Sequence, residues 1–262
     1  QHSMITKSIE RAQKKVEENN FGVRKRLLEY DDVMNSQREV IYRRRRNALY
    51  GERISVDIAN MMYDSISSVI HEGLESRDYE GFKFELIRNF SIDNPIDEKE
   101  FLTSNADELI EKIYAIAIEF YQKKTDAVAK MAFPVISNVY HEEGTNYENI
   151  VVPFTDGKKT IQVVTPLQKA FETEGKELIR SFEKSIILAM IDNAWKEHLR
   201  EMDDLKQSVQ GAVYEQKDPL LIYKFEAFEL FKQMIDRTNK EIITFLIKGS
   251  LPQQSEAPRV QE

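Results

Sequence analysis

The fold of this chain is decided by two helical stretches and the short tip between them. The first stretch reads LAMIDNAWKEHLREMDDLKQSV over residues 188–209, the tip reads GAVYEQKDP over residues 211–219, and the second reads FEAFELFKQMIDRTNKEIITF over residues 225–245. Apolar residues recur at steps of three and four in both stretches, which places them on one face of a helix. They are Leu188, Ile191, Trp195, Leu199, Met202, Leu205 and Val209, and then Phe225, Phe228, Phe231, Ile235, Ile242 and Phe245. The pattern predicts a helical hairpin over residues 179–246.

The tip of this hairpin has the composition of an exposed contact. We predict that Gly211 ends the first helix and that Asp218 with Pro219 begins the second. Two helices that pack on each other would hold the tip away from the rest of the chain, so the ring of Tyr214 has little core in which to bury. The alternative is that this ring folds back onto the hairpin. Trp195, the single Trp, is interpreted as an anchor between the two helices.

Residues 5–50 are predicted to form one long helix. Apolar or aromatic residues follow helical spacing at Ile9, Val16, Val23, Leu27, Tyr30, Met34, Ile41 and Ala48. Gly22 costs roughly 1 kcal/mol relative to Ala but does not break a helix, and Gly51 is expected to end it. Such a helix is either a support with several elements packed along it or an ordinary coiled-coil arm, and periodicity alone leaves both readings open.

The middle of the chain is predicted to contain a helical lobe and a small β insertion. The lobe, residues 51–132, comprises shorter helices near 54–75, 79–89, 97–103 and 105–131, with apolar faces at Ile58, Met62, Ile66 and Ile70, and at Leu109, Ile113, Ile116 and Phe120. Within residues 133–178, the stretch 135–140 is β-branched, and two further β-branched runs flank Asp156-Gly157, which is typical of a two-residue hairpin turn.

These elements together define a mainly α fold class with five parts. They are a long scaffold helix at 5–50, the helical lobe at 51–132, the β insertion at 133–178, the two-helix hairpin at 179–248 and a linker-like, disordered tail at 249–262.

Composition excludes several classes of protein. The chain has 262 residues, a net charge of -8 and no Cys, which excludes a disulfide framework and thiolate metal sites. No apolar run approaches the ~20 residues that a membrane-spanning helix needs. Residues 1–50 hold 12 Lys or Arg and 7 Asp or Glu, so a basic arm precedes an acidic body. This asymmetry favours pairing within the protein or docking on an acidic partner, and the overall acidity disfavours nucleic acid as a partner.

Catalytic chemistry is not indicated anywhere in the sequence. A phosphate-binding loop needs Gly, four residues and then Gly-Lys-Ser or Gly-Lys-Thr, and neither it nor a dinucleotide fingerprint is present. Asp31-Asp32 and Asp203-Asp204 are neighbours on helices, so their carboxylates point about 100° apart. His198, one turn after Trp195, is interpreted as a packed or locally bonded residue. We therefore expect no catalytic residues, no metal site and no cofactor in this chain.

Several strings resemble one protein family, that of SecA, the bacterial preprotein translocase ATPase. Residues 8–17 (SIERAQKKVE) resemble the junction that leaves its second motor domain. Residues 24–33 (RKRLLEYDDV) resemble its long scaffold helix, and Asn35, Gln37 and Arg38 continue the match. Residues 120–124 (FYQKK) are similar to the end of its wing domain. Residues 182–184 (FEK), 195–199 (WKEHL), 216–219 (QKDP) and 223–224 (YK), with Tyr214, resemble its two-helix finger.

The resemblance implies that the chain corresponds to the C-terminal part of such a translocase. The scaffold helix would contact the motor domains in cis, with Gln37 and Arg38 as candidate contacts. The finger would enter the SecY channel, with Tyr214, Val213, Gln216 and Lys217 touching the unfolded preprotein and Trp195 bracing the finger. ATP and Mg would belong to the motor domains and not to this chain. The parent would be cytoplasmic, associated peripherally with the inner face of the plasma membrane, where acidic phospholipid is a further partner.

Two other functions are weighed against this one. A stand-alone helical adaptor would bind a protein partner through the long helix and the hairpin. A helical hydrolase would need titratable residues that converge in one pocket, and no spacing in the sequence supports that.

Overall fold

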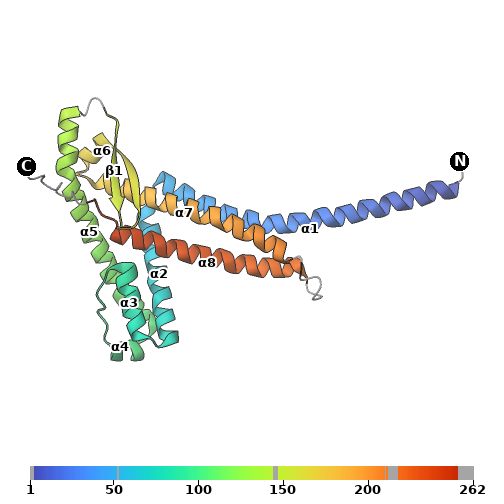
Figure 1. Ribbon diagram of the computed structural model, residues 1–262, viewed down its shortest axis with the longest axis horizontal. Coiled ribbons are helices and arrows are strands. Elements are labelled where there is room, and N and C mark those ends of the chain that lie inside the picture. Colours follow the sequence, from blue (N-terminus) through green and yellow to red (C-terminus); the bar gives the residue numbers. More distant parts are fainter. Residues whose placement is uncertain (1–2, 52, 144–146, 210, 212–217, 253–262) are drawn as a thin grey trace, which may run out of the picture. The chain divides into compact units, whose positions relative to one another are not determined.

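The computed structural model describes residues 3–51, 53–143, 147–209, 211 and 218–252. Over these residues the protein has eight helices and one two-stranded antiparallel sheet (Figure 1), which confirms the mainly α fold. The elements are α1 (Ser3–Tyr50), α2 (Ile54–Ser76), α3 (Tyr79–Phe90), α4 (Glu98–Thr103), α5 (Ala106–Glu143), β1 (Asn149–Thr155), β2 (Thr160–Pro166), α6 (Leu167–Glu172), α7 (Lys176–Ser208) and α8 (Pro219–Lys248).

The chain forms two compact units. Unit 1 comprises residues 1–44 and 194–234, and unit 2 comprises residues 45–193 and 235–262. Since the boundaries fall inside α1, α7 and α8, these three helices contribute residues to both units.

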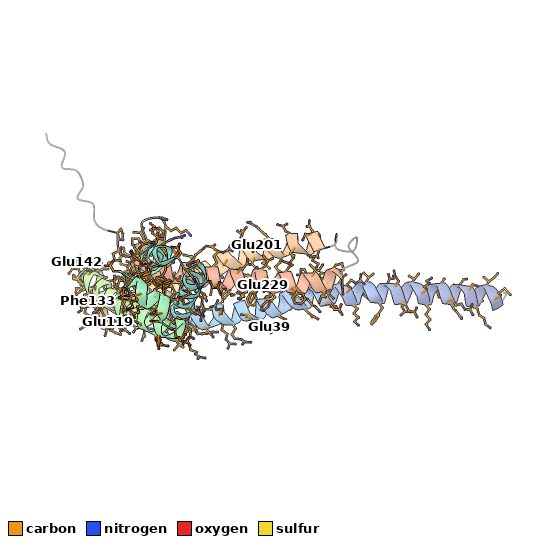
Figure 2. All side chains as sticks on the ribbon, turned by 90° about the horizontal axis from the view of Figure 1, so that it is seen from below. Glu39, Glu119, Phe133, Glu142, Glu201 and Glu229 are labelled. Carbon is orange, nitrogen blue, oxygen red and sulfur yellow. The ribbon has the colours of Figure 1, made fainter. Side chains whose placement is uncertain are left out.

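Unit 1 is built from parts of three helices. Figure 2 marks them by Glu39 on α1, Glu201 on α7 and Glu229 on α8, and shows the three helices side by side. The first part of α1 continues beyond this packing, and residues 4–28 are exposed throughout. The prediction of one helix over residues 5–50 is confirmed.

Unit 2 has its core between α2, α3, α4 and α5. The predicted apolar face of α2 is confirmed, since Ile58, Met62, Ile66 and Ile70 are all at most 2% exposed. The aromatic rings of Phe82 on α3 and Phe101 on α4 stack with centroids 4.7 Å apart. Both short helices start with a side-chain cap, because Asp78 accepts a hydrogen bond from the Gly81 N–H and Asp97 accepts one from the Glu100 N–H.

Helix α5 differs from the prediction in its end and in its buried face. We predicted an end near residue 131, but the helix continues through Pro134 to Glu143. Tertiary packing explains the extension, because the rings of Phe133 and Tyr140 stack on Phe171 of α6 with centroids 6.0 and 4.1 Å apart. Figure 2 shows Phe133 and Glu142 along this last part of the helix.

The buried face of α5 agrees with the prediction at Leu109 and Ile113, which are at most 1% exposed, but shifts by one residue in the next turns. Phe120 is 37% exposed, whereas Tyr121 is only 7% exposed. The Tyr121 hydroxyl donates a 2.8 Å hydrogen bond to Glu183 of α7, which fixes this orientation of the helix.

The β-hairpin is confirmed, but its turn is longer than the predicted two residues. Strands β1 and β2 pair from Asn149↔Pro166 to Thr155↔Thr160, which leaves the four residues 156–159 in the connection. The Asp156 carboxylate accepts hydrogen bonds from the backbone N–H groups of Lys158 and Lys159, and Gly157 adopts a φ of 88°. These two bonds close the longer turn.

A buried polar cluster joins α5 to α7 and α8 inside unit 2. Besides its bond to Tyr121, Glu183 interacts with Lys124, whose ammonium donates a 2.6 Å hydrogen bond to the Leu246 carbonyl. Burial lowers the pKa of Lys124 to about 8 against the opposing influence of Glu183, and burial raises the pKa of Glu183. Two of the strings that define the family resemblance, residues 120–124 and 182–184, therefore meet in space.

Candidate interaction site

The end of α7 and the start of α8, which adjoin the tip of the hairpin, pack with α1, so three helices and not two form this core. Tyr30 of α1 lies in one buried cluster with Met202 and Val209 of α7 and with Tyr223 and Ala227 of α8, all at most 5% exposed. The rings of Tyr30 and Tyr223 are tilted, with centroids 4.7 Å apart. The scaffold helix therefore completes the core of the hairpin. The helical spacing placed Tyr30 on a stripe of this helix but did not indicate its partner.

Charged groups surround this aromatic pair. The Lys206 ammonium lies 3.8 Å from the Asp31 carboxylate and 5.6 Å from the centre of the Tyr30 ring. Burial raises the pKa of Tyr223 to about 12, and the negative charges of Asp203 and Asp31 add to the effect. Tyr223 is therefore a neutral phenol at physiological pH.

A buried hydrogen-bond chain links all three helices of unit 1. The Gln37 side chain donates from Nε2 to the Ala227 carbonyl of α8 at 2.9 Å. Its Oε1 lies 2.9 Å from Nε2 of His198 on α7. Because an amide oxygen only accepts, His198 donates this bond from Nε2. The other ring nitrogen, Nδ1, lies 3.8 Å from the Glu201 carboxylate. This confirms that His198 is packed, but its hydrogen-bond partner Gln37 is 161 residues away in the sequence and not local.

An aromatic row runs beside this chain. Trp195 is 9% exposed, and its ring lies 5.6 Å from that of His198, which lies 5.6 Å from the ring of Phe231 on α8. Trp195 is thus buried within unit 1 beside His198, which itself contacts α8.

The predicted site residues fall into three environments. Gln37 is 7% exposed and faces into unit 1, whereas its neighbour Arg38 is exposed and donates from Nη1 to Asn35 Oδ1 at 2.9 Å. Tyr214, Val213, Gln216 and Lys217 lie outside the described residues. Next to them, Asp218 begins α8, and its carboxylate accepts from the Leu220 N–H at 3.0 Å.

The first half of α8 carries an apolar surface that the sequence analysis assigned wrongly. Phe225 and Phe228 were predicted to face the core, but they are 67% and 62% exposed, and Leu221 is 55% exposed. The core positions are Tyr223 and Ala227 instead, because α8 has to pack against α1 as well as α7. The spacing of Leu221, Phe225 and Phe228 was a visible signal, but spacing does not tell which face of a helix is covered.

A second exposed apolar surface follows the first half of α1. Its members share helical spacing and exposures above 50%, and they are Met4, Ile5, Ile9, Val16, Phe21, Val23, Leu27 and Leu28. Apolar surface on this scale is typical of protein contacts.

The described residues contain no group of three or more His, Asp or Glu side chains that could hold a metal ion. None of the described helices combines the length and the apolar character that crossing a membrane would require.

The fold and these contacts define a helical scaffold module whose outstanding features are a braced two-helix hairpin and exposed apolar helix faces. Comparison with known proteins gives the family: the chain belongs to the SecA wing and scaffold domain family, whose model matches residues 1–250.

The curated relatives carry the name protein translocase subunit SecA. The relative from Christiangramia forsetii is 61% identical over 262 residues, which cover 100% of this chain and 23% of that protein. The relative from Flavobacterium psychrophilum is 61% identical over 254 residues (97% and 23%), and that from Parabacteroides distasonis is 51% identical over 261 residues (100% and 23%). The chain thus spans about 23% of the length of the relatives that it matches. These matches favour the translocase interpretation over the stand-alone adaptor.

Proposed function

We propose that this chain serves as the scaffold, wing and finger region of an ATP-driven protein translocase. In this role residues 5–50 are the scaffold helix, 51–132 the wing, 133–178 an insertion, 179–248 the finger and 249–262 the linker. The main support is the family membership together with the three-helix packing of Tyr30, Met202 and Tyr223 in the part of the finger that adjoins its tip.

The scaffold helix is proposed to contact the motor domains in cis. The exposed apolar residues between Met4 and Leu28 offer a surface for this contact, and Arg38 offers a charge at its exposed side. Since Gln37 is buried, we assign it an indirect part: it holds α1 against the finger through Ala227 and His198. A motor domain that moves α1 would thereby move the finger.

The finger is proposed to contact the translocating preprotein and the SecY channel. Tyr214 is the central contact, with Val213, Gln216 and Lys217 beside it, because an aromatic ring offers apolar contact and a hydroxyl to many different sequences. Trp195 braces the finger. We add Leu221, Phe225 and Phe228 as an apolar surface on the second finger helix, available to the channel or the preprotein.

The remaining chemistry belongs to other parts of the translocase. ATP and Mg would bind in the motor domains, so this chain acts as a mechanical and interaction module and not as an enzyme by itself. The translocase would work in the cytoplasm at the inner face of the plasma membrane, with acidic phospholipid as an additional surface.

The test is preprotein transport by a full-length translocase that contains this region. Tyr214→Ala is expected to slow transport while basal ATP turnover stays close to wild type, because the ring acts on the preprotein and not on the nucleotide. Phe84→Ala, which removes an exposed aromatic ring from α3 in unit 2, is the matched control and should transport normally. Transport at the wild-type rate by the Tyr214→Ala protein would contradict the fingertip assignment.

A further inference from the structure

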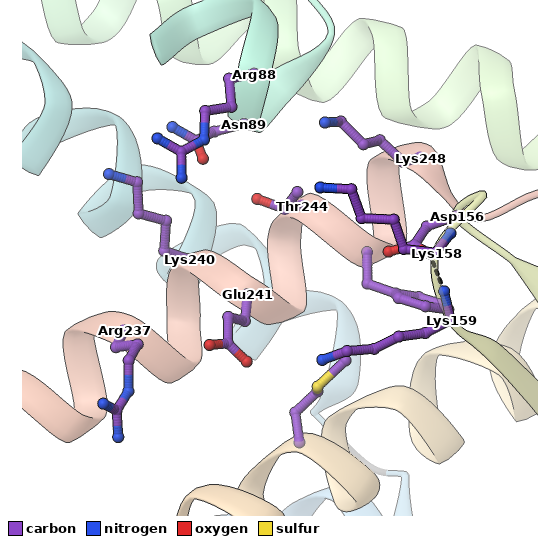
Figure 3. Close-up of a pocket in the computed structure, with 12 residues that line it drawn as sticks. Arg88, Asn89, Asp156, Lys158, Lys159, Arg237, Lys240, Glu241, Thr244 and Lys248 are labelled. Carbon is purple, nitrogen blue, oxygen red and sulfur yellow. Dashed lines mark hydrogen bonds between the residues drawn. The ribbon is translucent and has the colours of Figure 1, made fainter.

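Six of the twelve residues that line a cavity of about 520 Å³ in unit 2 are cationic (Figure 3). It lies between the end of α3, the turn that joins β1 to β2, and the last turns of α8. The cations are Arg88, Lys158, Lys159, Arg237, Lys240 and Lys248, and only two carboxylates, Asp156 and Glu241, join them. Although the chain has a net charge of -8, the excess of cationic over anionic side chains around this cavity makes a region of positive potential.

Two nearby carboxylates, Asp156 and Glu85, are already engaged. Asp156 accepts 2.7 and 2.9 Å hydrogen bonds from the backbone N–H groups of its own turn. Burial opposes its ionisation, but these bonds prevail and leave the pKa of Asp156 below its ordinary value. Glu85, which is outside the cavity lining, is shared by Arg88 at 2.9 Å and Lys240 at 3.4 Å. Within the described residues, no carboxylate forms an ion pair with Lys158 or Lys248.

The geometry brings these charges from separate elements to one space. Lys240, Thr244 and Lys248 follow each other at steps of four, so they share one face of α8. Figure 3 shows the side chains of Lys158 and Lys248 pointing into the space bordered by Thr244 and Arg88. Like charges that converge in this way repel one another, and an anion bound between them would relieve the repulsion.

We propose that this cavity binds a compact, multivalent phosphate compound, either an inorganic polyphosphate or a soluble phosphoester. Ammonium groups and a hydroxyl that approach from several directions suit tetrahedral phosphate oxygens. A planar carboxylate would favour a free guanidinium fork. Arg88 is already held by Glu85, and Figure 3 shows Arg237 pointing away from Lys158 and Lys248. Cations from three elements face one space, so a compact ligand can contact all of them at once. An extended acidic peptide would instead require cations spaced along a groove. This site is separate from the fingertip and does not depend on the function proposed for it.

The test is calorimetric titration of the 262-residue chain with inorganic tripolyphosphate at constant ionic strength. The double variant Lys158→Glu/Lys248→Glu should bind at least about tenfold more weakly, because two attractive charges become repulsive. The control Lys130→Glu/Lys169→Glu changes the net charge equally at exposed positions of α5 and α6 outside the cavity. Its affinity should stay within about twofold, since distant surface charges are screened. Circular dichroism verifies that each variant is folded, and Lys158→Gln/Lys248→Gln replaces the first variant if it is not.

Three results would overturn the proposal. One is the absence of tripolyphosphate binding to the wild-type chain beyond that seen with an equal ionic strength of sodium chloride. Another is an equal loss of affinity in the control variant, which would indicate general attraction. The third is binding to phosphatidylglycerol vesicles that requires Lys158 and Lys248 while tripolyphosphate and glycerol 3-phosphate do not bind, which would assign the site to a lipid headgroup.

Discussion

The hydrogen-bond chain through Gln37 allows a sharp prediction about coupling between the scaffold helix and the finger. Gln37 and His198 are 7% and 0% exposed, and a 2.9 Å bond joins their side chains. We consider Gln37→Leu, His198→Leu and the double variant. Each single substitution removes one partner of the bond and leaves the polar atom of the remaining partner buried without that bond. The double substitution removes both polar groups.

The expected magnitudes follow from this difference. Gln37→Leu leaves His198 Nε2–H without its acceptor, and such a buried orphan costs about 1–3 kcal/mol. The Ala227 carbonyl loses the bond from Gln37 but keeps its place in the helix pattern. His198→Leu costs a similar ~1–3 kcal/mol for the orphaned Gln37 Oε1, in addition to the ring contacts with Trp195 and Phe231. The double variant should cost about 1 kcal/mol less than the sum of the two single variants, within the ~0.5–3 kcal/mol typical of residues in contact.

The assay is urea unfolding followed by tryptophan fluorescence. Trp195 is the single Trp of the chain and its ring lies 5.6 Å from that of His198, so it reports on unit 1. Gln207→Leu, at an exposed position of α7, is the control and should change the free energy of unfolding by no more than about 0.5 kcal/mol. Additive single effects, or a Gln37→Leu cost equal to that of the control, would refute the coupling.

Three further predictions concern stability. Since burial lowers the pKa of Lys124 to about 8, below the ordinary ~10.4, the unfolded chain holds a proton between these values that the folded chain has released. The free energy of unfolding should therefore rise with pH in this window by up to about 1.4 kcal/mol per pH unit. Urea unfolding followed by circular dichroism should show a smaller rise for Lys124→Met than for the wild-type chain. An equal rise in the two proteins would contradict the assignment. Tyr223→Ala should lower the free energy of unfolding by about 3–5 kcal/mol in the fluorescence assay, because it empties a core position. Tyr223→Phe keeps the ring and should lower it by under about 1 kcal/mol. Equal losses in the two variants would be inconsistent with a packing role. Arg45→Ala breaks the half-exposed 2.6 Å ion pair with Asp192 but should cost under about 1 kcal/mol, less still in high salt, and a larger loss would indicate a further role for Arg45.

Much of the secondary structure was predictable from local signals. Gly51, with a φ of 73°, ends α1 as predicted, and the predicted helix at 54–75 matches α2. The apolar face of α2 was also correct, because this helix packs as the sequence pattern indicates. Signals such as a helix-ending glycine and apolar periodicity depend only on residues close together in the sequence, so they can be recognised without the tertiary structure.

The parts of the candidate site that were missed depend on distant residues. Gln37 could not be assigned to the interior from its neighbours, because its partners Ala227 and His198 are 190 and 161 residues away. The exposure of Phe225 and Phe228 follows from the packing of α8 on two helices at once. In α5, contacts of Phe133 and Tyr140 with Phe171 outweigh the β-branched composition that argued against a helix.

The sequence by itself determined most of the helices, the β-hairpin and the family, because periodicity, caps and motifs are properties of neighbouring residues. Only the tertiary structure decided that α1 completes the core of the hairpin, which faces of α5 and α8 are buried, and that six cations from α3, the β-turn and α8 surround one cavity. Helical spacing defines a stripe of residues on a helix, but whether that stripe is covered depends on which distant element packs against it.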